Sequence, residues 1–539
     1  MPAADPSRAT ATEPVEHIEG ALGRIATDHA AGRGWKVRLR TMLAVTGPGI
    51  IVMVGDNDAG GVSTYAQAGQ NYGYSLLWVL LLLIPVLIVN QEMVVRLGAV
   101  TGIGHARLIN ERFGRFWGWF SVGDLFVLNF LTIVTEFIGV SMAASYLGAS
   151  KYLVVPVAAV LLVVIVATGS FRRWERAMFA FIAVSLVQIP LALLSHPQWG
   201  QIGRHFVVPG IQGGVSGDAV LLIIAMVGTT VAPWQLFFQQ SNLIDKRISP
   251  RLVSYARADT VFGSFVVVVG AAAIVLAAEY AARGTPALGH FTDAAGVARL
   301  LGEHSTVLGA LFSILLLDAS IIGAAAVTLA TSYAFGDVFR LRHSLHRGFR
   351  EAKQFYASYS LLVGLAAMIV LIPGAPLGLI TEAVQALAGL LLPSASVFLL
   401  LLCNDREVLG PWANPRWLNL VASVIIAVLL GLSGTLMATT LFPTLNVAAL
   451  TAWMGAGLVV VLVAAAFAMR FASGSPGVRP QPASTMSGKE RMSWRMPPLA
   501  RLRPVQWSPG LKLGMLALRG YLVVSVLLLV LKAIQLGTT

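Results

Sequence analysis

The sequence predicts an all-α protein that crosses a membrane many times. Of its 539 residues, 56% are apolar and only 12% are charged, and the mean hydropathy is +0.76. A soluble domain carries roughly a quarter charged residues, so this chain lacks the polar surface that a cytosolic enzyme or a disordered scaffold needs. Apolar runs of about 20 residues, long enough to cross a bilayer as a helix, alternate with short polar connectors.

The order of apolar and polar segments predicts four parts. Residues 1–40 are polar, end in a basic stretch and lack the apolar core of a cleaved signal, so we expect a cytoplasmic tail. A membrane domain over 41–469 follows, then a basic linker over 470–512 that is rich in Pro, Ser and Gly, and a further membrane helix over 513–536. Within the membrane domain we expect twelve helices, at 41–70, 74–100, 116–147, 152–169, 174–195, 218–241, 254–281, 306–336, 354–373, 376–403, 418–442 and 446–469.

The positions of the positive charges predict the orientation. With a cytoplasmic N-terminus, 33 of the 38 Lys and Arg residues fall on the inner side, and the outer five are Lys151, Arg204, Arg283, Arg299 and Lys532. Inner loops of membrane proteins carry such an excess, so the net charge of +13 indicates a multi-pass protein of a cell membrane. The basic loops lack the interleaved aromatic residues of a nucleic-acid groove. We therefore expect the lipid bilayer, and no nucleic acid, as a partner.

Two of the predicted helices are interrupted inside the membrane. The first contains Gly55-Asp56-Asn57-Asp58-Ala59-Gly60-Gly61, and the sixth contains Gly228-Thr229-Thr230-Val231-Ala232-Pro233-Trp234. Pro233 removes a backbone donor and leaves carbonyl groups near Thr229 without one. In hydrocarbon such breaks are tolerated only where they are buried in protein or line a cavity. The two helices hold corresponding places in two five-helix halves, about 41–195 and 218–403, so the breaks predict inverted repeats with a binding site between them.

Asp56 and Asp58 lie near the middle of the membrane in the first of these breaks. A carboxylate there is costly unless a cation, a proton or a buried partner compensates it. Each of these residues, and Pro233, also has a purely structural interpretation. Asp58 could cap the second half-helix, and Asp56 could be a paired structural carboxylate. Pro233 could make a simple kink. The pair of breaks together favours a binding site over two unrelated kinks.

Further motifs resemble the Nramp (natural resistance-associated macrophage protein) family of divalent metal transporters. The resemblance covers roughly residues 41–440 and implies the leucine-transporter type of fold, with 418–469 as additional C-terminal helices. The matching motifs are Gly47-Pro48-Gly49, Gln67-Ala68-Gly69, Gly73-Tyr74, Leu76-Leu77-Trp78-Val79-Leu80-Leu81, Arg96-Leu97-Gly98 with Thr101-Gly102, Glu136-Phe137-Ile138-Gly139, and Leu391-Leu392-Pro393 with Asn404-Asp405.

The chain departs from the family pattern at its metal ligands. The aspartate of the family's metal motif is kept as Asp58, but the asparagine ligand falls on Gly61. The methionine ligand falls on Ala232 and the histidine of the proton route on Trp234, and an acidic residue linked to proton release falls on Ile133. These losses resemble the Nramp-related magnesium transporter branch. That resemblance implies import of Mg²⁺, with Mn²⁺ as a possible second substrate, and weak or absent proton coupling.

The chemistry of the retained donors agrees with this implication. Thioether and imidazole ligands favour softer transition metals, whereas carboxylate, carbonyl and water suit magnesium, calcium and manganese. Magnesium also keeps several of its waters, which a site with small residues can accommodate. The predicted metal site comprises Asp58, Thr229 through its carbonyl, Gly61, Ala232, Asp56 and Gln385, and the predicted helix-break and pathway residues are Asn57, Gly60, Pro233, Trp234 and Glu136.

Other polar residues in the membrane leave alternatives open. Asp318 and Glu382 are intramembrane acids that could be functional or could form hydrogen bonds within the bundle. Trp234 is expected to pack rather than to bind metal, because an indole only donates. The lone Cys403 excludes an internal disulfide and a thiolate cluster, and no resident cofactor is expected.

Three other functions compete with magnesium import. A proton-coupled importer of manganese or iron and a cation-coupled symporter of organic solutes would share the fold. A membrane-embedded enzyme such as a lipid transferase would need a catalytic cluster, and the histidines fall in loops without ligand spacing. The sequence therefore favours a metal transporter over an enzyme.

Overall fold

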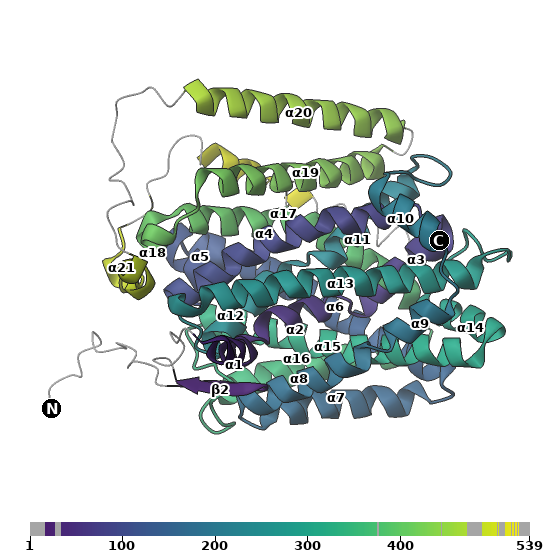
Figure 1. Cartoon of the computed structure of the whole chain (residues 1–539), viewed down its shortest axis with the longest axis horizontal. Helices are drawn as coiled ribbons and strands as arrows, with labels where there is room; N and C mark the ends of the chain where they lie inside the picture. Colours follow the sequence, from purple (N-terminus) through teal and green to yellow (C-terminus); the bar gives the residue numbers. More distant parts are fainter. Residues whose placement is uncertain are drawn as a thin grey trace.

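The computed structural model is helical apart from one β-hairpin, over the residues that it describes (Figure 1). These residues are 17–26, 34–374, 377–442, 445–471, 488–503, 505, 512–518, 520–521, 523–524 and 527. They include nine helical stretches that are long and apolar enough to cross a membrane. The fold is therefore all-α and polytopic, as the composition predicts.

The first half of the bundle begins with a short helix and an interrupted one. α1 (Trp35–Val45) leads into α2 (Pro48–Val54), and α3 (Ala59–Tyr72) continues the same span beyond the break. The remaining helices of this half are α4 (Leu77–Thr101), α5 (His105–Phe113), α6 (Arg115–Tyr146), α7 (Lys151–Ala167), α8 (Phe171–Ser185) and α9 (Gln188–Leu194).

The second half repeats the interruption at its own first span. α11 (Gly217–Thr230) ends before Pro233, and α12 (Pro233–Asp245) begins at it. The other elements from here to the end of the bundle, with the connector α10 (Trp199–Val207) before them, are η3 (Pro250–Leu252), α13 (Val253–Ala282), α14 (Ala294–His304), α15 (Thr306–Val338), α16 (Lys353–Leu371), α17 (Leu377–Asn404), α18 (Arg406–Leu409), η4 (Gly410–Trp412), α19 (Arg416–Leu441) and α20 (Val447–Phe471).

The two interrupted spans lie side by side in opposite order. α12 packs on α2, and α11 packs on α3, so the half-helix that follows one break lies beside the half-helix that precedes the other. α6 and α15 pack along each other, α13 packs along α2 and α3, and α17 packs along α11. α19 and α20 form the outer layer at the top of Figure 1. This packing encloses both breaks within the bundle.

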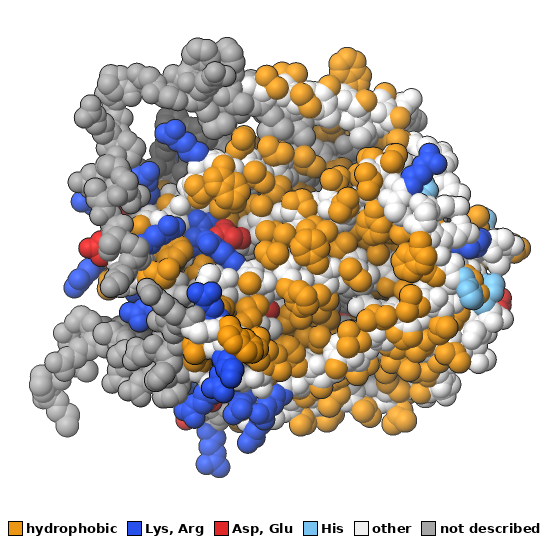
Figure 2. Space-filling model, in the orientation of Figure 1, with side chains coloured by type: hydrophobic (Ala, Val, Ile, Leu, Met, Phe, Trp, Pro, Cys, Tyr) orange, Lys and Arg blue, Asp and Glu red, His pale blue; other side chains and the backbone are white. Residues whose placement is uncertain are grey.

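The surface of the bundle separates into an apolar belt and one basic end. Figure 2 shows hydrophobic side chains over the middle of the visible face and most of the Lys and Arg side chains at the end where α1, α5 and β2 lie. The opposite end shows few basic side chains. An apolar belt of this kind is the surface that a lipid bilayer covers.

The polar N-terminal region holds more structure than the expected tail. β1 (His17–Gly20) and β2 (Gly23–Ala26) form an antiparallel hairpin in which Ile18 pairs with Ile25. Both isoleucines are buried, and the hairpin packs on α1 and α8. These two apolar residues in a polar segment explain the hairpin, since alternation along each strand turns them to one face.

A buried ion pair lies where the hairpin meets the bundle. Lys246 Nζ lies 2.6 Å from Glu175 Oε1, and both side chains are 0% exposed. Glu175 also accepts a hydrogen bond from the backbone N–H of Ala21, and Lys246 donates to the carbonyl of Thr46. Gly47 has a φ of 152°, and a side chain there would overlap the Glu175 carboxylate. The pair thus joins the hairpin, the start of α2, α8 and the end of α12.

Part of the expected basic linker docks on the basic end. α21 (Gly488–Ser493) and η7 (Leu499–Arg501) lie within it. Trp412 Nε1 donates to the carbonyl of Arg491, whose guanidinium lies 4.4 Å from the Trp412 ring centre. Arg112 forms an ion pair with Asp405 and donates to the carbonyl of Arg503. Within the predicted linker, residues 488–503 therefore contact the bundle. Most of the predicted helix over 513–536 lies outside the described residues.

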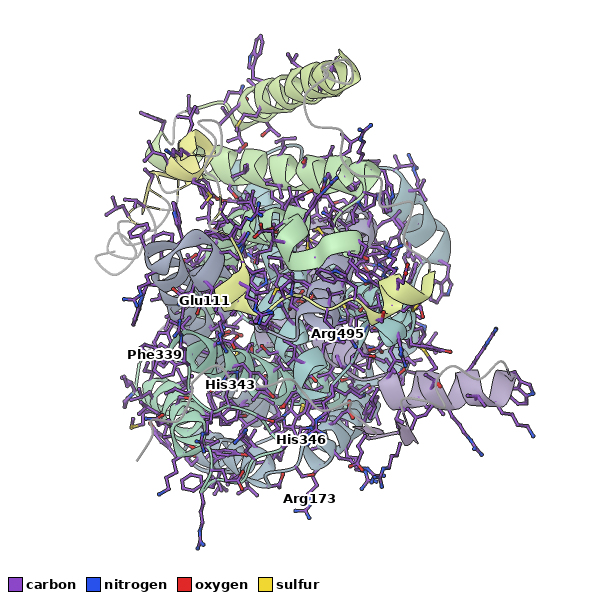
Figure 3. All side chains as sticks on the ribbon, turned by 90° about the vertical axis from the view of Figure 1, so that its left-hand side faces the viewer. Glu111, Arg173, Phe339, His343, His346 and Arg495 are labelled. Carbon is purple, nitrogen blue, oxygen red and sulfur yellow. The ribbon has the colours of Figure 1, made fainter. Side chains whose placement is uncertain are left out.

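The loop between α15 and α16 is held at the same end by His343. Its Nε2 lies 3.2 Å from Asp337 Oδ1, and its Nδ1 lies 2.8 Å from the carbonyl oxygen of Leu341. Figure 3 shows this end of the molecule, with His343 and His346 labelled. Desolvation lowers the pKa of His343, but the hydrogen bond and charge of Asp337, the Leu341 carbonyl and the charge of Asp245 outweigh it. The pKa is therefore raised above its ordinary value of 6.5.

We expect this loop to loosen as the pH rises. Because the pKa of His343 is raised in the folded protein, its stabilising contribution is complete below pH 6.5 and is lost as the pH rises through the folded value. Hydrogen exchange of residues 340–352, corrected for the intrinsic rate, should therefore increase on the alkaline side of pH 6.5. His343→Gln should remove the pH dependence, and His290→Gln, in an exposed loop, should retain it. The same pH dependence in both variants would contradict the assignment.

Candidate functional site

The break in the first span places Asp58 at the start of α3. Its Oδ1 accepts a hydrogen bond of 2.7 Å from the backbone N–H of Gly61, so Asp58 is the N-cap of this half-helix. Asp58 is buried. One carboxylate oxygen of Asp58 therefore caps the helix, which is the structural interpretation given above, and the other oxygen is available for a further role.

Glu136 of α6 lies directly beside Asp58. Its Oε2 accepts a hydrogen bond of 3.0 Å from the N–H of Ala59, and its Oε1 is buried with no hydrogen-bond partner among the described residues. Gly323 of α15 makes room for both acids, because a Cβ there would lie 2.7 Å from Glu136 Oε2 and 2.8 Å from Asp58 Cβ. Two buried carboxylates that lie close together repel each other unless a proton or a cation compensates them.

Asp56 lies in a chain of amides that crosses to the other interrupted span. Gln235 of α12 donates its side-chain N–H to Asp56 Oδ1, and Gln91 of α4 donates to Gln235 Oε1 at 3.0 Å. The second oxygen of Asp56 is buried and has no hydrogen-bond partner in the described part of the chain. Asp56 is therefore partly paired, and one of its oxygens faces the interior unused.

Thr229 lies opposite the first break, at the end of α11. In a continuous helix the N–H of the residue four positions later would donate to the Thr229 carbonyl. That residue is Pro233, which has no N–H. The Thr229 hydroxyl is buried, has no partner within the ranges that the structure describes, and would lie 3.2 Å from a Cβ at Gly61. Such a Cβ would also lie 2.8 Å from the carbonyl oxygen of Asp56, which is backbone and does not yield. Gly61 is therefore required by close packing, and a larger residue there would displace the break.

Ala232 and Gln385 complete the predicted ligand set. Ala232 is the N-cap residue of α12 and is buried. Gln385 of α17 is buried against Gly60, where a side chain would overlap its amide, and its carbonyl would lie 2.8 Å from a Cβ at Gly228. The two breaks and α17 thus come together, with only small residues between them.

Two other predicted residues of the breaks point elsewhere. Asn57 donates its side-chain N–H to the carbonyl of Val267 at 3.1 Å, toward α13. Trp234 is buried against Phe238, with ring centres 5.9 Å apart, and its N–H has no partner among the described residues. The Trp234 ring also lies against Gly55, at the end of α2.

Comparison with known proteins places this arrangement in a family. A family model described as natural resistance-associated macrophage protein-like matches residues 49–439, well over half of the chain. The chain belongs to the Nramp family. Members of this family are metal transporters, so the alternative of a membrane-embedded enzyme is excluded for this Nramp protein.

Relatives of this Nramp protein match over most of their length. The divalent metal cation transporter MntH of Ralstonia nicotianae is 30% identical over 413 residues, which are 73% of this chain and 90% of the relative. MntH of Deinococcus radiodurans is 28% identical over 439 residues, 79% of this chain and 95% of the relative. The crystal structure of a manganese transporter from Eremococcus coleocola superposes with a TM-score of 0.61 at 20% identity, over 84% of this chain and 97% of that chain. This likeness confirms the leucine-transporter type of fold.

The site of this Nramp protein differs from a resident metal centre. Within the described ranges, no three His, Cys, Asp or Glu side chains come together in a group that could hold a metal ion. Asp56 and Asp58 are accompanied instead by amides, a hydroxyl and backbone oxygens.

Of the two unexplained acids, Asp318 lies outside this group. It accepts a hydrogen bond from Ser185 of α8, on the far side of α15 from Gly323. The side chain of Glu382 lies outside the described residues.

Several residues of the site were missed in the sequence. Gln235 and Gln91 bind each other across two helices, and Tyr65 lies 2.7 Å from the Thr230 hydroxyl. A signal was present for Gln235, because a buried amide two residues after Pro233 is energetically costly unless it has a hydrogen-bond partner. Gly323 had no comparable signal.

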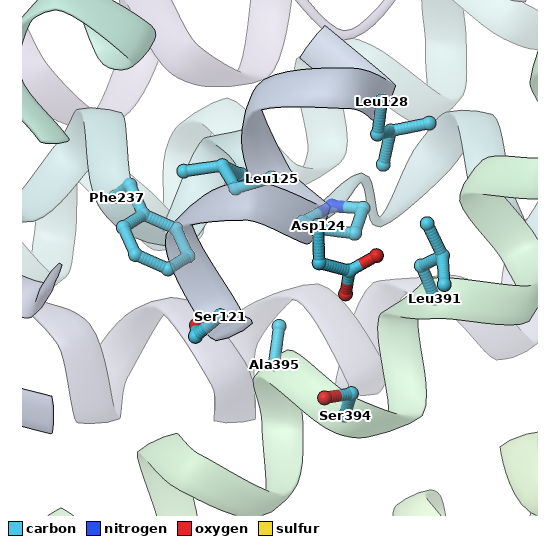
Figure 4. A pocket seen from close by; sticks show the side chains of 9 residues that line it. Ser121, Asp124, Leu125, Leu128, Phe237, Leu391, Ser394 and Ala395 are labelled. Carbon is cyan, nitrogen blue, oxygen red and sulfur yellow. The ribbon is translucent and has the colours of Figure 1, made fainter. Parts of the chain in front are cut away.

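Asp124 was also missed, and it lines a small cavity beside the break of the sixth span. The cavity is about 10 Å³, close to the volume that one water needs. Figure 4 shows the Asp124 carboxylate between α6 and α17, near Leu128, Leu391 and Ser394. Pro233, at the break of the sixth span, lines the same cavity. Leu128 and Leu391, which also line the cavity, are buried.

Proposed function

We propose that this Nramp protein carries a divalent metal ion across the membrane, with Mg²⁺ as the preferred substrate and Mn²⁺ as a second one. The observation that carries the proposal is the pair of buried carboxylates at the break of the first span. Asp56 and Asp58 form no ion pair within the described residues, and they lie opposite the carbonyl that Pro233 leaves without a donor. A divalent cation compensates two such charges.

The donors around the breaks favour a hard ion. Carboxylate, amide and backbone oxygens are present, whereas Gly61, Ala232 and Trp234 supply neither sulfur nor imidazole. Oxygen donors suit Mg²⁺ and Mn²⁺, and a site of small residues accommodates an ion that keeps part of its water shell. The names of the relatives, a divalent metal cation transporter and a manganese transporter, support a divalent substrate and make Mn²⁺ the competitor to test.

The same residues support transport without proton coupling. Ile133 and Trp234 are buried at positions where the family resemblance implies proton carriers, and neither side chain titrates. A negative-inside potential alone contributes about 2.3 kcal/mol per charge per 100 mV, and about twice that for a divalent ion. We propose import in this direction, with the basic end of Figure 2 and the N-terminus on the cytoplasmic side.

Uptake by the reconstituted protein tests the proposal. In vesicles with a negative-inside potential, we expect Mg²⁺ and Mn²⁺ to enter without acidification of the lumen, which a trapped pH dye would report. Competition of Mg²⁺ uptake by Mn²⁺, Ca²⁺ and Fe²⁺ would rank the substrates. Robust metal-coupled proton flux would overturn the uncoupled mechanism, and exclusion of Mg²⁺ in favour of Mn²⁺ or Fe²⁺ would overturn the preference. Absence of any divalent uptake would contradict the function itself.

Two substitutions at Ala232 test the metal specificity in the same uptake experiment. Ala232→Met places a thioether at the start of α12, whereas Ala232→Leu adds similar bulk without sulfur. We expect the methionine variant alone to shift competition toward Cd²⁺ by about tenfold, which corresponds to about 1.4 kcal/mol of added soft-ligand binding. An equal shift in both variants would indicate a steric effect.

A further inference from the structure

Asp318 is an intramembrane carboxylate that the proposed metal site does not use. Its Oδ2 accepts a hydrogen bond of 2.6 Å from the Ser185 hydroxyl, and its Oδ1 is buried with no partner among the residues that the structure describes. The residue is 4% exposed. It lies on α15 roughly 7 Å of helix rise from Gly323, on another side of the helix. Asp318 therefore belongs to a separate polar region.

The span that faces Asp318 is interrupted. α8 ends at Ser185 and α9 begins at Gln188, and between them the N–H of Val187 bonds three residues back, to Val184, at 2.9 Å. Pro190 explains the break, because its ring clashes with the carbonyl four residues earlier. Interrupted backbone at membrane depth is tolerated where it is buried in protein or lines a cavity. This third break thus lies beside a carboxylate, as the first one does.

A line of oxygen-bearing side chains joins this break to the break of the first span. Ser185 and Gln188 flank the two-residue turn between α8 and α9, and both are buried. Gln188 and Asn57 both lie against Gly270 of α13, where a Cβ would be 2.6 Å from Gln188 Oε1 and would overlap the Asn57 amide. The Asn57 Oδ1 is buried and has no partner. The line therefore contains two buried oxygens, on Asp318 and Asn57, that nothing in the described part of the chain satisfies.

The charge of this line is that of a single carboxylate. Asp318 forms no ion pair within the described residues, and Ser185, Gln188 and Asn57 are neutral. An uncompensated carboxylate in the membrane costs several kcal/mol, and one positive charge held by hard oxygen donors compensates it. We propose that the Asp318 line, made of Asp318, Ser185, Gln188 and Asn57, binds a monovalent alkali cation, with Na⁺ as its ligand.

Binding at this line would act on the metal site through Asn57. This residue lies between Asp56 and Asp58 in the chain, so an ion held there fixes the backbone that carries both carboxylates. This second consequence rests on the proposed function: Na⁺ should increase the affinity for the divalent ion. The binding of Na⁺ itself does not rest on it.

Direct binding of ²²Na⁺ to the purified full-length protein in nanodiscs, without divalent ions, tests the inference. We expect saturable binding that Asp318→Asn weakens about tenfold or more, that Ser185→Ala weakens less, and that Glu303→Gln, in an exposed connector, leaves unchanged. Ser185→Ala keeps the carboxylate and serves if Asp318→Asn fails to fold.

The outcomes separate the two sites. Na⁺ binding that is kept in Asp58→Asn and lost in Asp318→Asn supports the Asp318 line. Binding lost in Asp58→Asn and kept in Asp318→Asn, or no saturable binding in the natural protein, overturns it and leaves Asp318 as a protonated, hydrogen-bonded acid. Divalent uptake is measured on the same preparations. If Na⁺ binds but no divalent ion enters, the proposed function fails and this inference stands.

Discussion

Asp58→Asn should reduce metal uptake at subsaturating concentrations by about 100-fold, equivalent to about 2.7 kcal/mol. Asparagine is as good an N-cap as aspartate, so its side-chain oxygen can still accept the hydrogen bond from Gly61. The substitution therefore removes the charge and keeps the cap. A divalent ion then faces one carboxylate fewer at the break, next to Glu136, and loses most of its compensation.

Initial uptake rates in vesicles, at matched amounts of folded protein, would check this expectation. Asp58→Ala loses the cap as well, and should cost about 1 kcal/mol of stability in addition. Glu303→Gln removes an exposed acid and should transport as the natural protein does. Uptake by Asp58→Asn within a few-fold of the natural protein would mean that Asp58 is only a cap, and the metal site would have to be placed elsewhere.

The residues that could be predicted from the sequence are those whose signal is local. Gly and Pro inside apolar runs mark the two breaks, because each disrupts the helix at its own position. Asp58 and Thr229 follow directly from these breaks, and the structure places them on facing half-helices. The fold follows from the same local signals and the charge distribution along the chain.

The residues that could not be predicted depend on packing between distant segments. Gly323 matters because two carboxyls from other helices lie against it, and Gln91 matters because it reaches Gln235 from α4. The hairpin was missed for a related reason: Ile18 and Ile25 are two apolar residues in a polar segment, and only their pairing and burial make them significant.

The buried ion pair of Glu175 and Lys246 had no sequence signal either, since both residues lie among the basic clusters that fix the orientation. The pair connects four segments at the basic end. Asp259 strengthens this end by accepting hydrogen bonds from the N–H groups of Gly47 and Gly49, at 3.1 and 2.7 Å. This end of the bundle is therefore held together by buried charged side chains.

Lys246→Met should lower the free energy of unfolding by about 3–5 kcal/mol, because it leaves the Glu175 carboxylate buried without its partner. Adding Glu175→Gln should restore part of the loss, since no buried charge then remains. Arg340→Met removes an exposed ion pair with Glu111, in which the arginine side chain is 65% exposed, and should cost less than about 1 kcal/mol. Unfolding in nanodiscs would compare the variants.

The same variants show whether the Glu175–Lys246 pair only stabilises the bundle or also holds the hairpin on it. Because Glu175 holds the hairpin through the N–H of Ala21, Lys246→Met should increase hydrogen exchange over residues 17–26 more than over α13. If the destabilisation is no larger than that of Arg340→Met, the buried pair does not stabilise the fold. If the destabilisation is larger but hydrogen exchange rises equally in both regions, the pair stabilises the bundle as a whole and does not specifically hold the hairpin in place.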